Sequence, residues 1–191
     1  MSYIGNKPAN KAVVASDLDP AVITGQTALT SEPASTDEFL ISDAGVLKRL
    51  DASLIGGGKV LQVVAGTHAT EVSSSDSSYV TTNIDASITP SATSSKVLII
   101  ANTSGRKETA ASNGNYTIKR GSTDLDSTGN GFARVRDDAG GIFCNAPIVH
   151  LDSPSTTSST TYTMFMKSSS GSVFSSVSDS PSTIILMEIG A

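Results

Sequence analysis

The residues that could form a nucleophilic or metal site in this chain are one cysteine, Cys144, and two histidines, His68 and His150. Nucleophilic catalysis needs a Ser or Cys beside a base that a third group orients. These residue types are present, but no local signature such as Gly-x-Ser-x-Gly accompanies them. The histidines could meet in space, or meet their copies on a threefold axis, and hold a metal. Because isolated histidines are usually structural, we expect no catalysis and no bound metal, and we expect Cys144 to be a small buried hydrophobic residue.

Two further segments are similar to ion-binding loops, and each lacks a residue that the chemistry requires. Residues 56–59 (GGGK) suggest a phosphate-binding loop, but such a loop needs a Gly where Ser53 stands and a hydroxyl residue where Val60 follows the lysine. We therefore predict a linker there. Residues 124–131 alternate oxygen-bearing side chains with glycines, as a calcium loop does, but Arg134 stands near the position of the closing carboxylate. We expect a tight turn and no cofactor.

Two clusters of charged residues stand out in a chain that is poor in charge, at residues 106–108 and 134–138. They have two interpretations: solvated faces that pair their own charges, or contacts with a receptor or a neighbouring subunit. Arginine suits the second role, because its planar guanidinium pairs bidentately with carboxylates, including those of acidic sugars. The candidate contact residues are Arg106, Lys107, Arg134, Arg136, Asp137 and Asp138.

The overall composition narrows the class of protein. The chain has a net charge of -5, a pI near 4.9 and no Lys/Arg run, so we expect no nucleic acid partner. No window approaches the roughly 18 apolar residues of a membrane helix, and the N-terminus has no signal pattern, so we expect no membrane insertion and synthesis in a cytoplasm. A single cysteine cannot form an internal disulfide. Stability must therefore come from packing and association.

The fold that must position these residues is expected to be mainly β, with an antiparallel, jelly-roll-like β-sandwich in the C-terminal part. The chain is rich in Ser, Thr, Val and Gly, and apolar runs alternate with turns at the spacing of a sandwich or barrel. The continuous apolar runs at residues 97–100 and 184–187 predict strands covered on both faces, either centrally or at a subunit interface. The predicted strands are 59–66, 69–73, 82–89, 96–102, 115–120, 131–136, 141–152, 159–167, 172–178 and 183–189.

The first 57 residues differ from the rest of the chain. They hold three of the seven prolines, which limit the hydrogen bonding of a sheet, and their apolar pieces are short. Residues 38–50 predict a β-hairpin, with Gly45 able to adopt positive φ in its turn, and residues 51–55 predict one helical turn. We therefore expect an extended, hairpin-containing attachment and oligomerisation segment at residues 1–57, ordered only against other chains. A β-sandwich domain is expected at residues 58–191.

A series of segments carries a resemblance to a known family. These are residues 1–8 (MSYIGNKP), 39–51 (FLISDAGVLKRLD), 59–64 (KVLQVV), 88–99 (ITPSATSSKVLI), 151–154 (LDSP), 160–163 (TTYT) and 182–189 (STIILMEI). Together they resemble the tail-fibre or fibre-like virion proteins of marine, cyanophage-like bacteriophages. The resemblance touches most of the chain, and the C-terminal series is more specific than the leader.

The resemblance implies a structural role in a bacteriophage virion. The implied protein is a homotrimer that docks to other virion proteins through its N-terminus and exposes a β-sandwich for host-surface adhesion, with a host cell-surface glycan as a partner. The candidate docking residues are Tyr3, Ile4, Lys7 and Pro8. Because no long repetitive shaft follows the hairpin, a capsid decoration or head-fibre protein is the alternative. A glycan-active spike is a third hypothesis, against which stands the lack of paired carboxylates in a long parallel β-helix.

Overall fold

The computed structural model describes residues 36–55 and 59–190, together with the single residues 25, 27, 29, 33 and 34. The chain divides into two units, Met1–Ile55 and Gly56–Ala191. The predicted docking residues Tyr3, Ile4, Lys7 and Pro8 lie outside the described residues, and so do the glycines at residues 56–58 that separate the two predicted parts.

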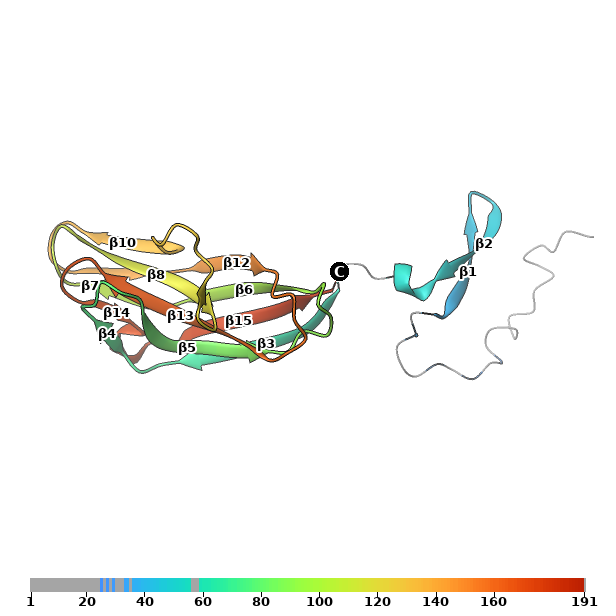
Figure 1. The fold of residues 1–191 in the computed structure, drawn as a ribbon, viewed down its shortest axis with the longest axis horizontal. Helices are drawn as coiled ribbons and strands as arrows, with labels where there is room; N and C mark the ends of the chain where they lie inside the picture. The colour runs from blue at the N-terminus through green and yellow to red at the C-terminus, as the bar shows by residue number, and fades with distance from the viewer. Residues whose placement is uncertain are drawn as a thin grey trace, which may run out of the picture. The chain divides into compact units, whose positions relative to one another are not determined.

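In the first unit, residues 38–51 form the β-hairpin that the sequence predicts (Figure 1). β1 (Glu38–Asp43) pairs antiparallel with β2 (Val46–Asp51) through a two-residue turn. Ala44 and Gly45 both have positive φ, 50° and 82°, as a type I′ turn requires. The 3₁₀ turn η2 (Ala52–Leu54) follows, and the Asp51 side chain caps it by accepting the Ser53 N–H.

The second unit is built of antiparallel strands joined by turns. One 3₁₀ turn, η3 (Val177–Asp179), precedes the last strand. The strands are β3 (Val60–His68), β4 (Val72–Ser74), β5 (Val80–Ile88), β6 (Lys96–Asn102), β7 (Ser104–Lys107), β8 (Ser112–Arg120), β9 (Thr123–Asp124), β10 (Ala133–Asp137), β11 (Ile142–Asn145), β12 (Ile148–Asp152), β13 (Thr160–Ser168), β14 (Val173–Ser175) and β15 (Ser182–Ile189).

These strands form two layers (Figure 1). One layer is the sheet β10-β8-β13-β5, with β9 paired to β8. The other layer consists of two four-stranded sheets, with the strand orders β12-β6-β15-β3 and β11-β7-β14-β4. Each strand of one sheet directly precedes or follows its counterpart in the other sheet along the chain. The two sheets therefore continue one another as one long layer.

The order in which the strands pair is that of a jelly roll. If each divided strand is counted once and the two-residue β9 is set aside, eight strands remain. The first pairs with the last (β3 with β15), the second with the seventh (β5 with β13), the third with the sixth (β6 with β12) and the fourth with the fifth (β8 with β10). A long antiparallel ribbon wrapped into two sheets produces these pairings. The predicted mainly β, antiparallel sandwich is confirmed.

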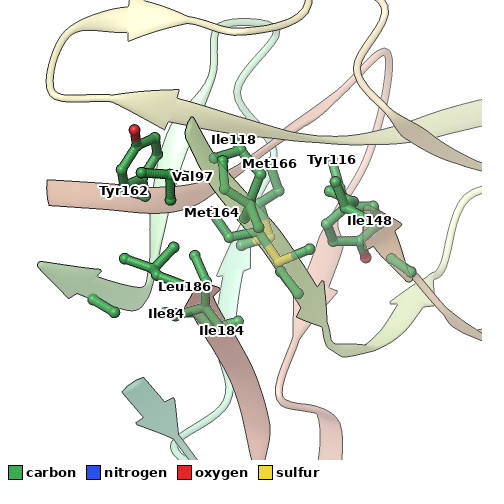
Figure 2. Close-up of a cluster of buried hydrophobic side chains, with 14 of the residues drawn as sticks. Ile84, Val97, Tyr116, Ile118, Ile148, Tyr162, Met164, Met166, Ile184 and Leu186 are labelled. Atoms are coloured by element: carbon green, nitrogen blue, oxygen red, sulfur yellow. The ribbon is translucent and has the colours of Figure 1, made fainter. Parts of the chain in front are cut away.

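The hydrophobic core lies between the two layers and uses alternate residues of the facing strands. Met164 and Ile118 from one layer and Ile184 and Leu186 from the other are fully buried (Figure 2). Since successive side chains of a strand point to opposite faces, the residues between these core positions point away from the core. The alternation of residues along the strands therefore sets the chemistry of the two outer surfaces of the sandwich as well as that of its core.

The structure differs from the predicted strands in three places. Residues 141–152 were predicted as one strand, which is wrong: β11 and β12 are separate, because Pro147 lacks an N–H and interrupts the ladder. The Ala146 N–H instead donates to the Thr103 carbonyl (2.9 Å), which lies between β6 and β7. β7 and the two-residue β9 were not predicted, because their residues are polar or charged. The other predicted strands are present with ends shifted by a few residues.

Candidate functional site

The outer face of the sheet β12-β6-β15-β3 is apolar across all four strands. Its outward side chains alternate with the buried ones that fill the core. We call this surface the apolar face; it consists of Leu61, Val63, Ala65, Leu98, Ile100, Val149, Leu151, Ile185 and Met187.

Strand register aligns these side chains in two rows. One row runs Val149, Ile100, Ile185, Ala65, and the second runs Leu151, Leu98, Met187, Val63. Val149 is 67% exposed, Val63 55% and Leu151 50%, so the edges of both rows face solvent. Directly cross-strand neighbours on one face are in contact distance, and the rows therefore form one continuous apolar surface.

The apolar runs at residues 97–100 and 184–187 were predicted to be covered on both faces. In the described residues of the second unit, the core covers only their inner side, while Ile100 is 36% exposed on the outer side. The contributions of β3 and β12 were not singled out in the sequence. The spacing of Leu61 and Val63 places both side chains on one face of a strand. That they extend an apolar surface can be known only once β3 and β12 are seen to flank β15 and β6.

The outer face of the other layer, β10-β8-β13-β5, is polar and carries a surplus of cations. Its charged outward residues are Asp85, Lys119, Asp124, Arg134, Arg136 and Lys167. The Lys119 ammonium lies 4.7 Å from the Phe165 ring centroid, and the Lys167 ammonium lies 4.4 Å from that of Tyr79. We call this surface the polar face. The two outer faces of one sandwich thus have opposite chemistry.

Arg106 lies on the outward side of β7, on the same layer as the apolar face. Its guanidinium carbon is 4.0 Å from the Phe174 ring centroid and 5.9 Å from that of Phe143, which is itself largely exposed. Its guanidinium also pairs with Glu108 (2.7 Å) and Glu71 (3.6 Å). A shallow hollow of about 490 Å³ beside Phe143 is lined by polar residues 104, 145, 178 and 180 and equally by the apolar side chains of Phe143, Cys144 and Val177.

The structure separates the remaining predicted contact residues into buried and exposed ones. Lys107 is fully buried and donates to the carbonyls of Ser170 (2.6 Å) and Ser172 (3.2 Å); burial lowers the pKa of its ammonium. Asp137 is also buried, and backbone N–H groups of residues 139–141 lower the pKa of its carboxyl. Lys107 and Asp137 therefore bind groups of the domain itself and are not exposed for contact with a receptor or another subunit.

The exposed members of the predicted set lie on both layers. Arg134 and Arg136 point outward from β10 on the polar face, and Arg136 pairs with the exposed Asp138 (2.6 Å). Arg106 is on the other layer. The structure therefore does not gather the predicted contact residues into one site.

The candidate nucleophile and histidines also lie apart. Cys144 is half-buried, and burial raises the pKa of its thiol against the lowering effect of the Gly105 backbone, which disfavours the reactive thiolate. His68 lies on β3 and His150 on β12, the two edge strands of one four-stranded sheet, so roughly 14 Å or more separates them. Among the described residues there is no group of three or more His, Cys, Asp or Glu that could hold a metal ion.

The segment similar to a calcium loop uses its carboxylates to close a turn. Asp126 accepts the Thr128 N–H (2.9 Å), the Thr128 hydroxyl (2.8 Å) and the Gly131 N–H (2.6 Å). Asp124 accepts the Thr117 hydroxyl (2.7 Å) and the Asp126 N–H (3.1 Å). The oxygens that a cation would need are thus bonded to donors of the domain itself.

No helix in the part of the chain that the structure describes has both the length and the apolar character to cross a membrane. No family model matches the chain, and no curated protein matches it.

Among solved structures, the chain is similar to VP2 of infectious bursal disease virus. The VP2 subviral particle has a TM-score of 0.42 and 12% identity, over 78% of this chain and 36% of that one. VP2 of the Gt strain has a TM-score of 0.40 and 14% identity, over 86% of this chain and 47% of that one. The chain thus spans less than half the length of these proteins, and at such TM-scores the likeness is loose.

Proposed function

We propose that this chain is a non-enzymatic structural subunit of a bacteriophage particle, similar to a tail fibre. In this proposal the N-terminal unit attaches to other virion proteins, and the jelly-roll domain is held in a homotrimer and exposed for host-surface adhesion. The observation that carries the proposal is the opposite chemistry of the two outer faces of one domain. A protein that must assemble with copies and also face solvent needs one apolar and one polar surface.

The segments that resemble marine phage fibre proteins support the assignment to a phage. The jelly roll is compatible with it, since viral capsid proteins and lectins use this fold, but fold analogy does not by itself specify a function. The chain would be made in the host cytoplasm and function in the virion.

The buried carboxylates support a structural role over a catalytic one. Glu188 accepts hydrogen bonds from Gln62 (2.6 Å) and from the Ser91 backbone N–H (2.7 Å). Asp152 accepts two bonds from Arg120 (3.0 and 2.8 Å) and one from Tyr162 (2.7 Å). Such fully bonded carboxylates hold strands together and have little free capacity to transfer a proton to a substrate.

Adhesion in this proposal works through multiplicity. Several weak contacts made at once by identical domains gain avidity without any covalent step. The polar face supplies suitable groups, since Arg134 and Arg136 are exposed there and can pair with the carboxylates of acidic surface sugars.

A capsid decoration or head-fibre protein is the second candidate. The observation that favours it is the short distance along the chain between the two units: the 3₁₀ turn after the hairpin ends at Leu54, and β3 begins at Val60. No repetitive shaft occupies the chain between them, as it would in a long fibre.

The test is the position and copy number of the chain in purified particles. Gold-labelled antibodies against the jelly-roll domain should label the tail or baseplate, and quantitative mass spectrometry should give tens of copies per particle. Hundreds of copies over the head would establish the capsid alternative. Particles that lack the chain would contradict both.

A further inference from the structure

We propose that the apolar face is the surface through which copies of this chain pack against one another. This inference rests on the proposed structural role and identifies the contact that assembly would use. The rows across β12, β6, β15 and β3 are continuous, and their backbone is already paired within the sheet. Copies can therefore meet through side chains alone, without unfolding any strand.

The size of the apolar face matches the centre of a stable interface. Six of its members are at least one-third exposed: Leu61, Val63, Ala65, Ile100, Val149 and Leu151. Together they expose on the order of several hundred Å² of apolar surface, about the largest patch that soluble monomers leave uncovered. A standard interface buries about 800 Å² per partner, which the apolar face and its surroundings can supply.

The chemistry of the apolar face favours a second copy as its occupant. In the two rows no side chain is charged; Asn102, Thr183 and Thr67 lie beyond them at one end of the strands, and Lys96 lies beyond them at the other. An apolar centre with a polar surround is the usual anatomy of a subunit interface. In a symmetric oligomer the same surface residues of each copy lie near the symmetry axis. Uncharged rows can therefore pack against the same rows of another copy without charge repulsion.

The polar face cannot pack against its own copy in this way. Lys119, Lys167 and Arg134 would bring like charges together, and only Asp85 and Asp124 among the described strand residues of this face offer opposite charges. Like charges brought together at an interface are unfavourable. Self-association through the apolar face leaves the polar face in solvent, where the proposed adhesion needs it.

The test is the mass of the full-length chain in solution over a range of concentrations, measured by analytical ultracentrifugation. The wild-type chain should sediment as a trimer. Val149→Glu and Val63→Glu each place a charge in the packed face, from opposite edges. Each should weaken association by at least about 100-fold, because a buried unpaired charge is costly.

The matched control is Ser87→Glu, which places the same charge on the exposed edge strand of the polar face. It should associate like the wild type. Circular dichroism checks the fold of every variant; if a Glu variant does not fold, Val149→Thr and Val63→Thr keep strand-forming side chains and should still weaken association.

Each outcome decides the inference. A dimeric wild type that the apolar-face variants dissociate would support the inference and correct the number of copies. A monomeric wild type, or folded apolar-face variants that associate normally, would overturn it. Either result would leave the position of the chain in the virion untouched, whereas particles without the chain would overturn the proposed function and not the self-association.

Discussion

At the scale of single residues, buried polar groups join distant parts of the chain. Glu188, near the end of β15, is fully buried and binds Gln62 of β3 and Ser91 of the loop after β5. Arg120, Asp152 and Tyr162 join β8, β12 and β13 in the same manner. These bonds bridge the two layers, so their loss should be felt in the stability of the whole domain.

Glu188 gives a prediction about stability and pH. Burial opposes its ionisation, but hydrogen bonds from Gln62 and Ser91 outweigh burial and lower its pKa from 4.5 to about 2. A depressed acid pKa adds stability above the unfolded value, and this stability is lost as pH falls from 4.5 through about 2. Glu188→Gln should reduce the free energy of unfolding at pH 7 by about 2 kcal/mol, since it disrupts buried bonds to a charged group.

The measurement is urea unfolding of the wild type and Glu188→Gln between pH 7 and pH 2. The difference between them should shrink as pH falls below 4.5, because the unfolded wild type then takes up a proton at Glu188 that the folded protein binds only near pH 2. Asp138→Asn removes an exposed carboxylate and should stay within about 0.5 kcal/mol of the wild type. A constant difference at every pH would contradict the assigned role of Glu188.

At the scale of elements, the two layers approach closely where β3 lies beside β5. Gly66 of β3 faces the backbone of β5, and a Cβ added there would lie 1.8 Å from the Asp85 carbonyl oxygen. A backbone atom cannot rotate away as a side chain can. The closure of this side of the sandwich therefore depends on the absence of a side chain at Gly66.

Gly66→Ala should force β3 and β5 apart and lower the free energy of unfolding by about 3 kcal/mol. Gly190→Ala is the matched control, because its added Cβ would meet only the flexible Leu61 side chain at 3.2 Å or more. That variant should lose less than about 1 kcal/mol. Equal urea midpoints for Gly66→Ala and the wild type would show that the strands separate without cost.

At the scale of the whole molecule, the second unit contains its complete core. Every buried core residue lies between Ile84 and Leu186, inside the jelly-roll domain. The first unit has a two-stranded hairpin in which Phe39, Leu40 and Val46 are exposed and no described residue is fully buried. A two-stranded hairpin alone is marginally stable in water.

We therefore expect residues 59–191, produced without the first unit, to unfold cooperatively with a Tm within about 3 °C of the full chain. Residues 1–57 alone should give the circular dichroism spectrum of an unfolded chain. Differential scanning calorimetry checks the first expectation. A first unit that folds in isolation, or a second unit that loses its cooperative transition, would contradict the division of roles between them.

The sequence was sufficient to predict those features that depend on neighbours in the chain. The hairpin at residues 38–50 follows from Ala44-Gly45 between two apolar runs, and β6 was predicted with the bounds that the structure has. Turn chemistry and residue periodicity are local, so they can be read without knowing the fold.

The tertiary structure alone decided which strands lie side by side and which side chains remain uncovered. β3 pairs with β15 from the other end of the chain, and only this pairing joins Val63 to Met187 in the apolar face. Lys107 was predicted at the surface from its charge, yet the layers enclose it. Burial depends on contacts between segments that are far apart in sequence. The pattern of residues adjacent in the chain does not show which distant segments will be in contact.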